Sequence, residues 1–309
     1  MNPLVTIITV NYRQAAITCE LLDSLRELAY APVEILLVDN GLETDETVRF
    51  QSRLPTVKVI LSKENLGFAG GNNLAIQQAK GDYILLLNND TLVPPGLLEP
   101  LVNLLAAEPA VGIVSPKIYY YDQPQMLQYA GTARIDFRTG RGADAARQQL
   151  DQGQFDQERA TDFAHGACML VRRQVFETIG LLTEDYFMYY EELDFSLRAR
   201  QRDWEIKFSP ATFIHHRESS SVGRFSSLKT YFMFRNRWLF IRRFGTKKEY
   251  RLFLTYFLTV GLPLNCLRFM LQGQWQHVQA LWAGMRWNVK KGSLPGFVPA
   301  RLFMTKEAS

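Results

Sequence analysis

The 309-residue sequence has only three cysteines, Cys19, Cys168 and Cys266, and only four histidines. The cysteines are far apart, without a CxxC pair or a His–Cys cluster, which argues against a disulfide framework and a structural zinc site. The Gly67–Asn73 segment has neither the Rossmann glycine spacing nor a Gly-Lys-Ser/Thr sequence. Because both motifs are missing, the segment argues against a dehydrogenase and a P-loop NTPase.

A secretion signal is also not expected. Residues 1–3 carry no positive side chain, and the apolar stretch Leu4–Val10 is too short for the core of a signal peptide and its cleavage site. Together with the scarcity of cysteine, this favours a reducing compartment. We therefore expect the catalytic part of the chain to be cytoplasmic.

The net charge of +4 is unevenly distributed along the chain. Residues 1–216 contain 19 Lys and Arg against 28 Asp and Glu, a net charge of −9, whereas residues 217–309 contain 16 against 3, a net charge of +13. Such an asymmetry indicates an anionic partner for the C-terminal part, either nucleic acid or a membrane surface. No nucleic-acid recognition motif accompanies the charge, so the inner face of the cell membrane is favoured.

Aromatic and apolar side chains accompany this positive charge. Aromatic residues and arginines intermingle between Tyr231 and Phe244, and the sixteen residues Leu252–Leu267 carry no charge. Because a spanning helix needs roughly 20 apolar residues, we predict a basic amphipathic helix that lies in the membrane interface. The alternatives are a buried core helix and a homodimer contact. We expect a catalytic domain over 1–226 and a helical, membrane-associating region over 227–309.

Short apolar runs alternate with helical patterns in the first hundred residues. The expected elements are strands at 5–10, 33–38, 57–61 and 83–87 and helices at 17–28 and 72–79. This alternation predicts an open, mostly parallel α/β sheet flanked by helices. We expect a nucleotide-binding part over about 1–115, an acceptor part over about 116–226, and an irregular excursion or mobile loop over 119–162.

Polar clusters follow three of the predicted strands. They are Asn11-Tyr12, Asp39-Asn40-Gly41 and Asn88-Asn89-Asp90. Ligands of open α/β sheets bind beyond the carboxyl ends of the strands, so these clusters predict a nucleotide site. The carboxylate of Asp90 can hold a Mg²⁺ or Mn²⁺ ion that bridges the two phosphates of a sugar nucleotide. The alternative is an ordinary Asn-Asp turn.

Two further clusters carry chemistry. The glycines of the Gly67–Asn73 segment let the backbone approach a ligand, and the helix that follows offers free N–H groups to phosphate. Glu191, Glu192 and Asp194 stand beside aromatic residues and can supply a general base with a raised pKa. The alternative for these carboxylates is a favourable position at the positive end of a helix.

As a set, these motifs resemble glycosyltransferase family 2, and within it the bacterial rhamnosyltransferase group. The resemblance runs from about residue 4 to 245 and rests on the segments 9–12, 38–40, 64–73, 87–91, 166–173 and 189–194. It implies a GT-A fold and inversion at the sugar carbon.

The resemblance also implies residue roles. It assigns Asp39 to the pyrimidine base and Asp90, with Asn88 and Asn89 nearby, to the metal ion and the diphosphate. It makes Glu192 the catalytic base. Glu191 is the second choice, because many members carry Glu-Asp where this chain has two glutamates. The other residues expected at the donor are Thr9, Asn11, Asn40, Asn65, Gly67, Gly71 and Asn72.

Histidines complete the expected site. The pair His215-His216 matches a histidine that can complete the metal or diphosphate site in such enzymes, and we assign this role to His215 against the alternative of a structural histidine. His165, Gly166 and Ala167 lie in the region that the family uses for the acceptor. We place Asp194 with them as a substrate residue.

We therefore predict an inverting glycosyltransferase that depends on Mg²⁺ or Mn²⁺. The resemblance favours dTDP-rhamnose as the donor, with UDP-sugars open, and a glycan or polyprenyl-linked acceptor in the synthesis of O-antigen or another surface polysaccharide. One alternative is a sugar nucleotidyltransferase, although residues 11–14 lack its usual glycine-rich first loop. The other is a non-catalytic, membrane-associated protein that binds sugar nucleotides.

Overall fold

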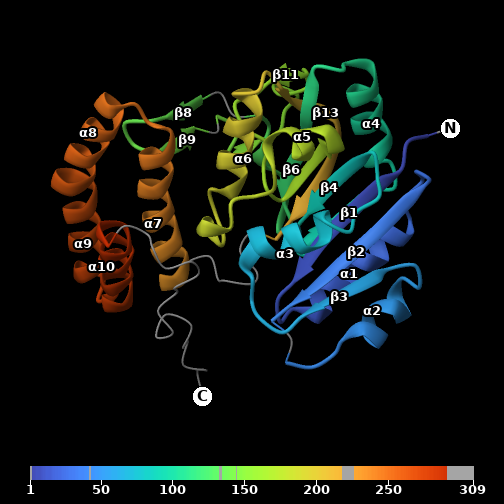
Figure 1. Ribbon diagram of the computed structural model, residues 1–309, viewed down its shortest axis with the longest axis horizontal. Helices are drawn as coiled ribbons and strands as arrows, with labels where there is room; N and C mark the ends of the chain where they lie inside the picture. The colour runs from blue at the N-terminus through green and yellow to red at the C-terminus, as the bar shows by residue number, and fades with distance from the viewer. Residues whose placement is uncertain (1, 42, 132–133, 144, 218–225, 291–309) are drawn as a thin grey trace. The chain divides into compact units, whose positions relative to one another are not determined.

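The computed structural model describes residues 2–41, 43–131, 134–143, 145–217 and 226–290 (Figure 1). The chain forms two compact units. The sheet unit comprises residues 1–134, 144–183 and 191–221, and the helical unit comprises residues 135–143, 184–190 and 222–309. Two internal segments therefore belong to the same unit as the C-terminal helices.

Among the described residues, an eleven-stranded sheet forms the centre of the sheet unit. Its strands are β1 (Val5–Asn11), β2 (Val33–Asn40), β3 (Lys58–Ser62), β4 (Tyr83–Leu87), β5 (Thr91–Leu92), β6 (Val111–Tyr120), β7 (Gln123–Tyr129), β10 (Gln149–Leu150), β11 (Arg159–Ala160), β12 (Cys168–Arg172) and β13 (Glu205–His216). The main order is β10-β7-β6-β12-β4-β1-β2-β3, and β13 pairs with β5, β6 and β11. Strands β1 to β4 are parallel, and β12 runs antiparallel between β4 and β6.

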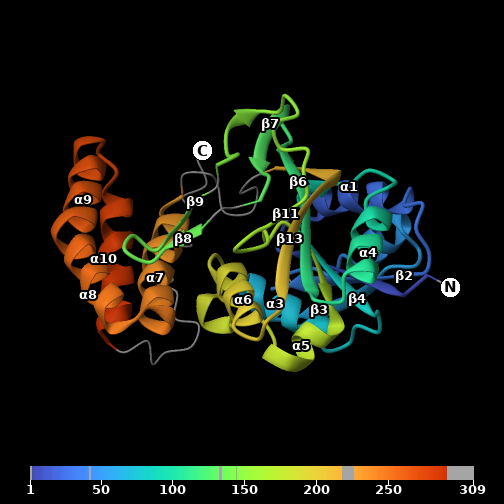
Figure 2. The same cartoon turned by 90° about the horizontal axis from the view of Figure 1, so that it is seen from above.

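Helices cover both faces of this sheet. They are α1 (Ala15–Arg26), α2 (Thr47–Arg53), α3 (Gly67–Ile76), α4 (Leu98–Ala107), α5 (Arg173–Ile179) and α6 (Glu191–Arg200). Helices α3, α5 and α6 lie on one face, and α1 and α4 lie on the other (Figure 2). Coverage on both faces explains why β1, β2 and β4, which are largely buried, are continuous apolar runs rather than alternating patterns. Strand β3 lies at the end of the strand order and is mostly exposed or half-buried.

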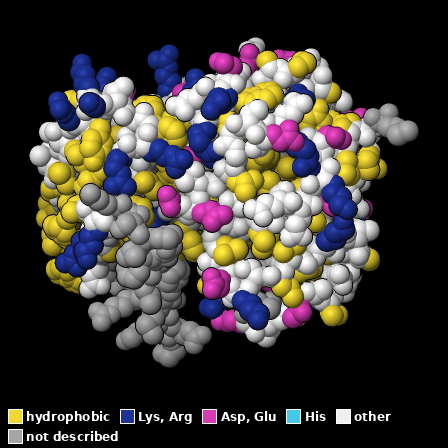
Figure 3. All heavy atoms as spheres, in the orientation of Figure 1, with side chains coloured by type: hydrophobic (Ala, Val, Ile, Leu, Met, Phe, Trp, Pro, Cys, Tyr) yellow, Lys and Arg dark blue, Asp and Glu magenta, His cyan; other side chains and the backbone are white. Residues whose placement is uncertain are grey.

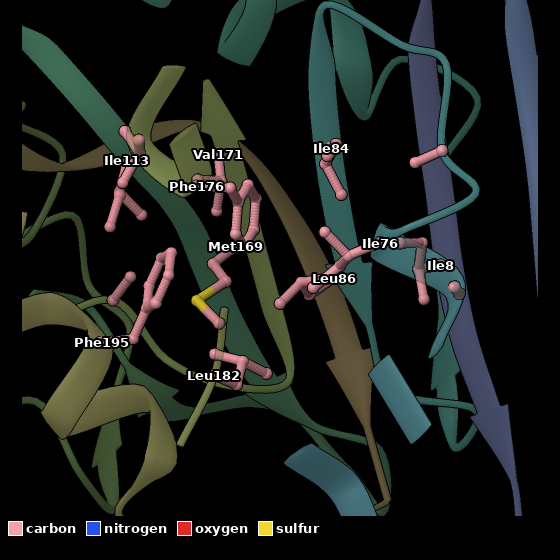
Figure 4. Packing of buried hydrophobic residues seen from close by; sticks show 14 of the residues in the cluster. Ile8, Ile76, Ile84, Leu86, Ile113, Met169, Val171, Phe176, Leu182 and Phe195 are labelled. Carbon is pink, nitrogen blue, oxygen red and sulfur yellow. The ribbon is translucent and has the colours of Figure 1, made fainter. Parts of the chain in front are cut away.

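The core on the face of α3, α5 and α6 joins the sheet to these helices. Ile8, Leu86 and Met169 come from three neighbouring strands and form one buried cluster with side chains of the helices, with Ile8 beside Ile76 of α3 and Met169 beside Phe176 and Phe195 (Figure 4). The rings of Phe176 in α5 and Phe195 in α6 lie 5.0 Å apart, centroid to centroid. All of these side chains are at least nine-tenths buried, so the two helices are fixed against the strands that precede the site.

The helical unit is built around α7. Its elements are β8 (Arg134–Asp136), β9 (Arg141–Ala143), the 3₁₀ turn Glu184–Tyr186, α7 (Ser227–Phe244), α8 (Lys247–Tyr256), the π-helical turn Phe257–Gly261, α9 (Leu262–Leu271) and α10 (Trp275–Val289). Helix α7 packs along α10, and Tyr231 and Phe232 of α7 are buried with Ala280 of α10. The part of the predicted C-terminal region over 291–309 lies outside the described residues.

Two expectations about elements were wrong. The segment 119–162 is not simply irregular, because β7 pairs antiparallel with β6 and is then extended by β10. The sequence pattern did not reveal β7 because its residues are largely polar; its first three residues are exposed and only its last three are buried. The helix expected at 72–79 begins earlier, at Gly67, so the glycines lie inside α3 rather than in a loop before it.

Candidate active site

The ends of β1 and β2 bring Asn11 and Asp39 together. These residues are partners in the parallel register, and Asn11 Nδ2 donates a hydrogen bond of 2.8 Å to Asp39 Oδ1. Asn11 Oδ1 in turn accepts a hydrogen bond of 2.8 Å from Thr18 Oγ1 in α1. Helix α1 therefore fixes the amide of Asn11, and this amide fixes the orientation of the Asp39 carboxylate.

Asp39 is almost completely buried, with 4% of its surface exposed. Burial raises the pKa of this carboxyl group, and the carboxylates of Glu46 and Asp45 raise it further, although the Asn11 hydrogen bond acts in the opposite sense. Its second oxygen, Oδ2, has no hydrogen-bond partner among the described residues. A buried acceptor of this kind suits a ligand that supplies an N–H donor, as a pyrimidine base does.

The asparagines and glycines around α3 organise the backbone. Asn40 Oδ1 accepts from the Leu66 N–H at 2.8 Å, and Asn65 Oδ1 accepts from the Gly67 N–H at 3.0 Å. The two side chains therefore accept hydrogen bonds from N–H groups at the start of α3, two of the groups that were expected from the sequence to be available to phosphate. Asn40 and Asn65 therefore act on the protein backbone.

Gly71 and Asn72 also have local partners. A Cβ atom on Gly71 would lie 2.9 Å from Val10 Cγ1, so glycine allows α3 to approach β1 closely. Asn72 Nδ2 donates to the Phe68 carbonyl at 2.8 Å. Thr9 is fully buried in β1, and its Oγ1 has no hydrogen-bond partner among the described residues.

Asp90, which follows β4, lies beside His216 at the end of β13. The distance from His216 Nε2 is 3.1 Å to Asp90 Oδ1 and 3.2 Å to Asn88 Nδ2. His216 Nδ1 lies 2.8 Å from Gln128 Oε1. Because this oxygen is an acceptor, it selects the tautomer with the proton on Nδ1, in which Nε2 accepts a hydrogen bond from Asn88 Nδ2 and lies against the Asp90 carboxylate.

This pairing differs from the predicted one, which assigned the role to His215. Successive side chains of a strand point to opposite faces, so only one of the two histidines can reach Asp90. The His215 ring instead lies 5.3 Å from the Phe213 ring and 5.8 Å from the Tyr119 ring. Asn89 also turns away from the histidine, because its Nδ2 donates to Thr18 Oγ1 at 3.0 Å.

The segment His165–Ala167 lies between this pair and α6. The His165 and His216 ring centroids are 6.1 Å apart, and the Ala167 carbonyl accepts from the Asn88 N–H at 3.0 Å. On its other side, a Cβ atom on Gly166 would lie 3.6 Å from Glu192 Cβ. The structure thus brings Glu192, the predicted acceptor segment and the Asp90–His216 pair to one place.

His165 is held in its neutral form. Its Nδ1 accepts a hydrogen bond of 3.1 Å from the Ala167 N–H, which leaves the ring proton on Nε2. Burial lowers the pKa of His165 to about 3, with a further contribution from His216. At neutral pH this side chain can therefore donate one hydrogen bond from Nε2 but carries no charge.

The three carboxylates of α6 have different surroundings. Glu191 is 4% exposed, and burial followed by repulsion from Glu192 and Asp194 raises its pKa well above the usual value. Asp194 is fully buried, and its Oδ1 accepts from Arg198 Nε at 2.6 Å and from Thr183 Oγ1 at 2.9 Å. The structure gives Asp194 a structural role in place of the predicted substrate contact. Only Glu192 combines partial exposure with a place beside Gly166.

Sequence reasoning missed His216 and Gln128 as site residues. The sequence motif included His216, which is adjacent to the chosen His215. Deciding between the two histidines required knowing which side chains of β13 face Asp90. Gln128 carries no signal, because it approaches His216 only through the pairing of β7 and β13 with β6. Among the described residues, no group of three or more His, Cys, Asp or Glu side chains is arranged to hold a metal ion by itself.

Comparison with known proteins identifies the family. Residues 6–180 match the family model described as glycosyl transferase family 2. The chain belongs to glycosyl transferase family 2.

Two relatives of this family 2 chain cover most of its length. It is 27% identical over 247 residues to an N-acetylglucosaminyl-diphospho-decaprenol L-rhamnosyltransferase of Mycobacterium tuberculosis, covering 72% of this chain and 79% of the relative. It is 29% identical over 239 residues to the low-salt glycan biosynthesis hexosyltransferase Agl10 of Haloferax volcanii, covering 76% and 74%.

The fold agrees with this assignment. The mannosyltransferase PcManGT of Pyrobaculum calidifontis, solved in complex with GDP-Man and Mn²⁺, matches with a TM-score of 0.56 and 19% identity, covering 96% of this chain and 77% of that one. The family 2 chain thus has the predicted GT-A fold, a mixed, mostly parallel sheet flanked by helices. Its activity is that of a glycosyltransferase, which replaces the alternatives of a nucleotidyltransferase and a non-catalytic binding protein.

Proposed function

We propose that this glycosyltransferase transfers a sugar, with inversion, from a nucleotide diphosphate to a hydroxyl group of a lipid-linked glycan. The observation that carries the proposal is the convergence of Asp90, His216 and Glu192 around the His165–Ala167 segment. One partly exposed carboxylate on one side and a carboxylate–imidazole pair on the other match the two tasks of the reaction, deprotonation of the acceptor and departure of the diphosphate.

Asp90 and His216 fit a divalent metal ion. Carboxylate oxygen and neutral imidazole nitrogen both bind Mn²⁺, and the oxygen also suits Mg²⁺. Neighbouring ligands of an octahedral ion, each at about 2.1 Å, lie about 3 Å apart, and the two atoms here are 3.1 Å apart. When bound, the ion would neutralise charge on the departing diphosphate. The solved mannosyltransferase with Mn²⁺ supports a divalent ion in this fold.

The chain's own residues would perform the other steps. Asp39 accepts a hydrogen bond from the base of the nucleotide and so fixes the donor at the ends of β1 and β2. Glu192 accepts the proton of the acceptor hydroxyl as its oxygen attacks the sugar carbon on the side opposite the diphosphate. Neutral His165 can donate a hydrogen bond from Nε2 to the acceptor without adding charge.

The donor and the acceptor follow from the relatives only as proposals. L-Rhamnose, from dTDP-rhamnose, is favoured because the mycobacterial relative is named as an L-rhamnosyltransferase. The same name, with its diphospho-decaprenol, supports an acceptor glycan on a polyprenyl diphosphate in surface polysaccharide synthesis. Such an acceptor would place the protein at the inner face of the cell membrane.

The helical unit supports this location. The continuous helix Lys247–Leu271 has a mean hydropathy of 1.4 over its most apolar window, of which 22% is buried, and is long and apolar enough to cross a membrane. Hydrophobic side chains gather over α8 and α9, with Lys and Arg side chains around them (Figure 3). Its uncharged part, Leu252–Leu267, would be about 24 Å long as a helix, shorter than a bilayer core of about 30 Å. We therefore propose that it lies in the membrane interface.

A donor screen tests the proposed function. We expect dTDP-rhamnose to raise the melting temperature of the protein in the presence of Mn²⁺, and to do so more than UDP- or GDP-sugars. Asp90→Ala should remove the Mn²⁺-dependent part of this shift, whereas Asp122→Ala, at an exposed position of the same unit, should retain it. Equal shifts for wild type and Asp90→Ala would refute the metal site, and no shift with any nucleotide sugar would refute the proposed donor class.

A further inference from the structure

The helical unit contains a cavity of about 610 Å³ that the proposed chemistry does not use. Its wall combines Arg141 of β9, Lys229 and Arg237 of α7, Arg268 of α9 and His277 of α10. Cavities of about 300–1,000 Å³ are typical of small-molecule sites. The volume is therefore sufficient for a diphosphate group together with the first part of a chain attached to it.

The charge of this cavity has one sign. Four of its lining residues are lysine or arginine, and none of the described lining residues is Asp or Glu. No carboxylate among the described residues forms an ion pair with Arg141, Arg237 or Arg268. Like charges converging on a concave surface attract anions, and guanidinium groups match the geometry of phosphate oxygens.

Aromatic and polar contacts hold several of these side chains in place. His277 Nδ1 lies 2.8 Å from Thr230 Oγ1, and its ring stacks on Phe269 with centroids 4.6 Å apart. Arg237 Nε donates to the Tyr190 hydroxyl at 3.3 Å. Contacts within the unit therefore orient His277 and Arg237 before any ligand arrives, which reduces the entropy cost of binding at these two residues.

The same helix that contributes Arg268 also presents apolar side chains to solvent. Leu264, Leu267 and Leu271 are 60%, 50% and 79% exposed, and their spacing of three and four residues places them on one side of α9. A basic cavity next to an exposed apolar surface is complementary to an amphiphilic anion, one with a charged head and a long hydrocarbon chain.

We propose that this cavity binds the diphosphate of an isoprenoid-linked acceptor, with the hydrocarbon chain running along the apolar surface of α9. The identity of the ligand, an isoprenoid-linked acceptor, rests on the proposed function. The residues of the binding site are inferred from the helical unit alone. Binding of the head group outside the sheet unit would let the enzyme recognise the carrier lipid separately from the sugar that receives the transfer.

The test uses farnesyl diphosphate as a probe, with farnesol and inorganic pyrophosphate as comparisons, on the full-length chain in detergent. The cavity variant is Arg141→Gln/Arg268→Gln, because both side chains are exposed and their loss leaves no buried group unpaired. The matched control is Arg251→Gln/Arg286→Gln, which removes the same charge from exposed positions of the same unit outside the cavity. Binding is measured by isothermal titration calorimetry.

We expect the wild type to bind farnesyl diphosphate more tightly than pyrophosphate or farnesol. The cavity variant should lose affinity for farnesyl diphosphate by about tenfold or more, while the control changes by less than about twofold. Arg268→Lys should restore part of the loss when Arg141 is intact. These results would support the proposal.

Other outcomes would overturn it. Equal losses in the cavity variant and the control would show general attraction of anions, and equal affinity for pyrophosphate and farnesyl diphosphate would assign the cavity to a free anion. Absence of binding to wild type would exclude the site. The Mn²⁺-dependent shift with nucleotide sugar is measured on the same samples. Its retention in the cavity variant separates failure of this site from failure of the proposed function.

Discussion

At the scale of single residues, the two glutamates that begin α6 illustrate how position separates chemically similar groups. Glu192 is partly exposed and lies against Gly166, whereas Glu191 is buried and repelled by its neighbours. A base must reach its substrate and be ionised to accept a proton. Partial exposure therefore favours Glu192 as the base, whereas burial and repulsion from its neighbours make ionisation of Glu191 oppose folding.

We predict that Glu192→Gln lowers kcat by about 10²–10⁴-fold, because the amide keeps the shape of the side chain but cannot accept the acceptor proton. Nucleotide affinity should change little, since Asp39 and Asp90 are intact. Glu205→Gln, at an exposed position, serves as the control. Steady-state kinetics with the donor found in the screen gives the measurement, and undiminished turnover would exclude Glu192 as the base.

Glu191 gives a prediction for the pH dependence of stability. Its folded-state pKa lies above the unfolded value, so the folded state binds the proton more tightly and loses stability as pH rises from about 4.5 through the folded pKa. Glu191→Gln removes this loss. We expect the variant to melt at a higher temperature than wild type at pH 8, and the difference to shrink towards pH 4. A difference that is constant from pH 4 to pH 8 would contradict the prediction.

At the scale of elements, α7 holds the segment 184–190 that leads into α6. Asn236 Nδ2 donates to the carbonyls of Tyr186, Met188 and Tyr189 at 2.8–3.0 Å, and the buried Arg235 donates to the Tyr186 carbonyl at 2.9 Å. Three non-glycine residues of this segment, Phe187, Tyr189 and Tyr190, have positive φ angles of 64° to 78°. Such backbone is unfavourable for L-residues and persists only where surrounding bonds determine it.

We predict that Asn236→Ala lowers the free energy of unfolding by about 1–3 kcal/mol, because the carbonyl groups of Met188 and Tyr189 lose their side-chain donor. Gln279→Ala, which removes an exposed amide from α10 of the same unit, should change it by less than about 0.5 kcal/mol. Urea denaturation followed by circular dichroism measures both. Equal stability of the two variants would show that Asn236 does not hold this segment.

At the scale of the whole chain, charge and exposed apolar surface are concentrated towards the C-terminus. Residues 217–309 carry a net charge of +13. The exposed apolar residues of α8, the π-helical turn and α9 are Leu252, Tyr256, Leu258, Val260, Leu264, Leu267, Met270 and Leu271. Positive charge attracts an anionic membrane over a distance that salt shortens, whereas apolar side chains bind only after contact. Electrostatic attraction and apolar contact together predict membrane binding that depends on the salt concentration and on the exposed leucine side chains.

We predict that the full-length chain binds vesicles containing phosphatidylglycerol and that binding weakens as salt is raised. Leu264→Glu/Leu271→Glu should reduce binding by about tenfold or more, because each leucine contributes about 1.5–3 kcal/mol when buried. Val48→Glu, at an 81% exposed position of the sheet unit, is the control. Vesicle co-sedimentation measures all three proteins. Unaltered binding of the double variant would place the membrane contact elsewhere.

Local sequence patterns were enough to predict an open, mostly parallel sheet and the polar residues that follow its first strands. Strands β1, β2 and β4 could be predicted because parallel strands covered on both faces need uninterrupted apolar runs, and such runs are visible without tertiary structure. The motifs at Asp39, Asp90 and Glu192 likewise depend on residues that are neighbours in the chain, so the family and its GT-A fold were predictable.

The contacts between side chains of distant segments became known only from the three-dimensional structure. His216 rather than His215 faces Asp90 because the side chains of a strand alternate between its faces, and the parity depends on how β13 pairs with β5 and β6. The helix beginning near Gly67 suggested N–H groups available to phosphate, but Asn40, at the end of β2, accepts the hydrogen bond of the Leu66 N–H just before α3. The basic cavity likewise combines β9, α7, α9 and α10. Contacts between distant segments carry no local sequence pattern, which is why these features could not be predicted.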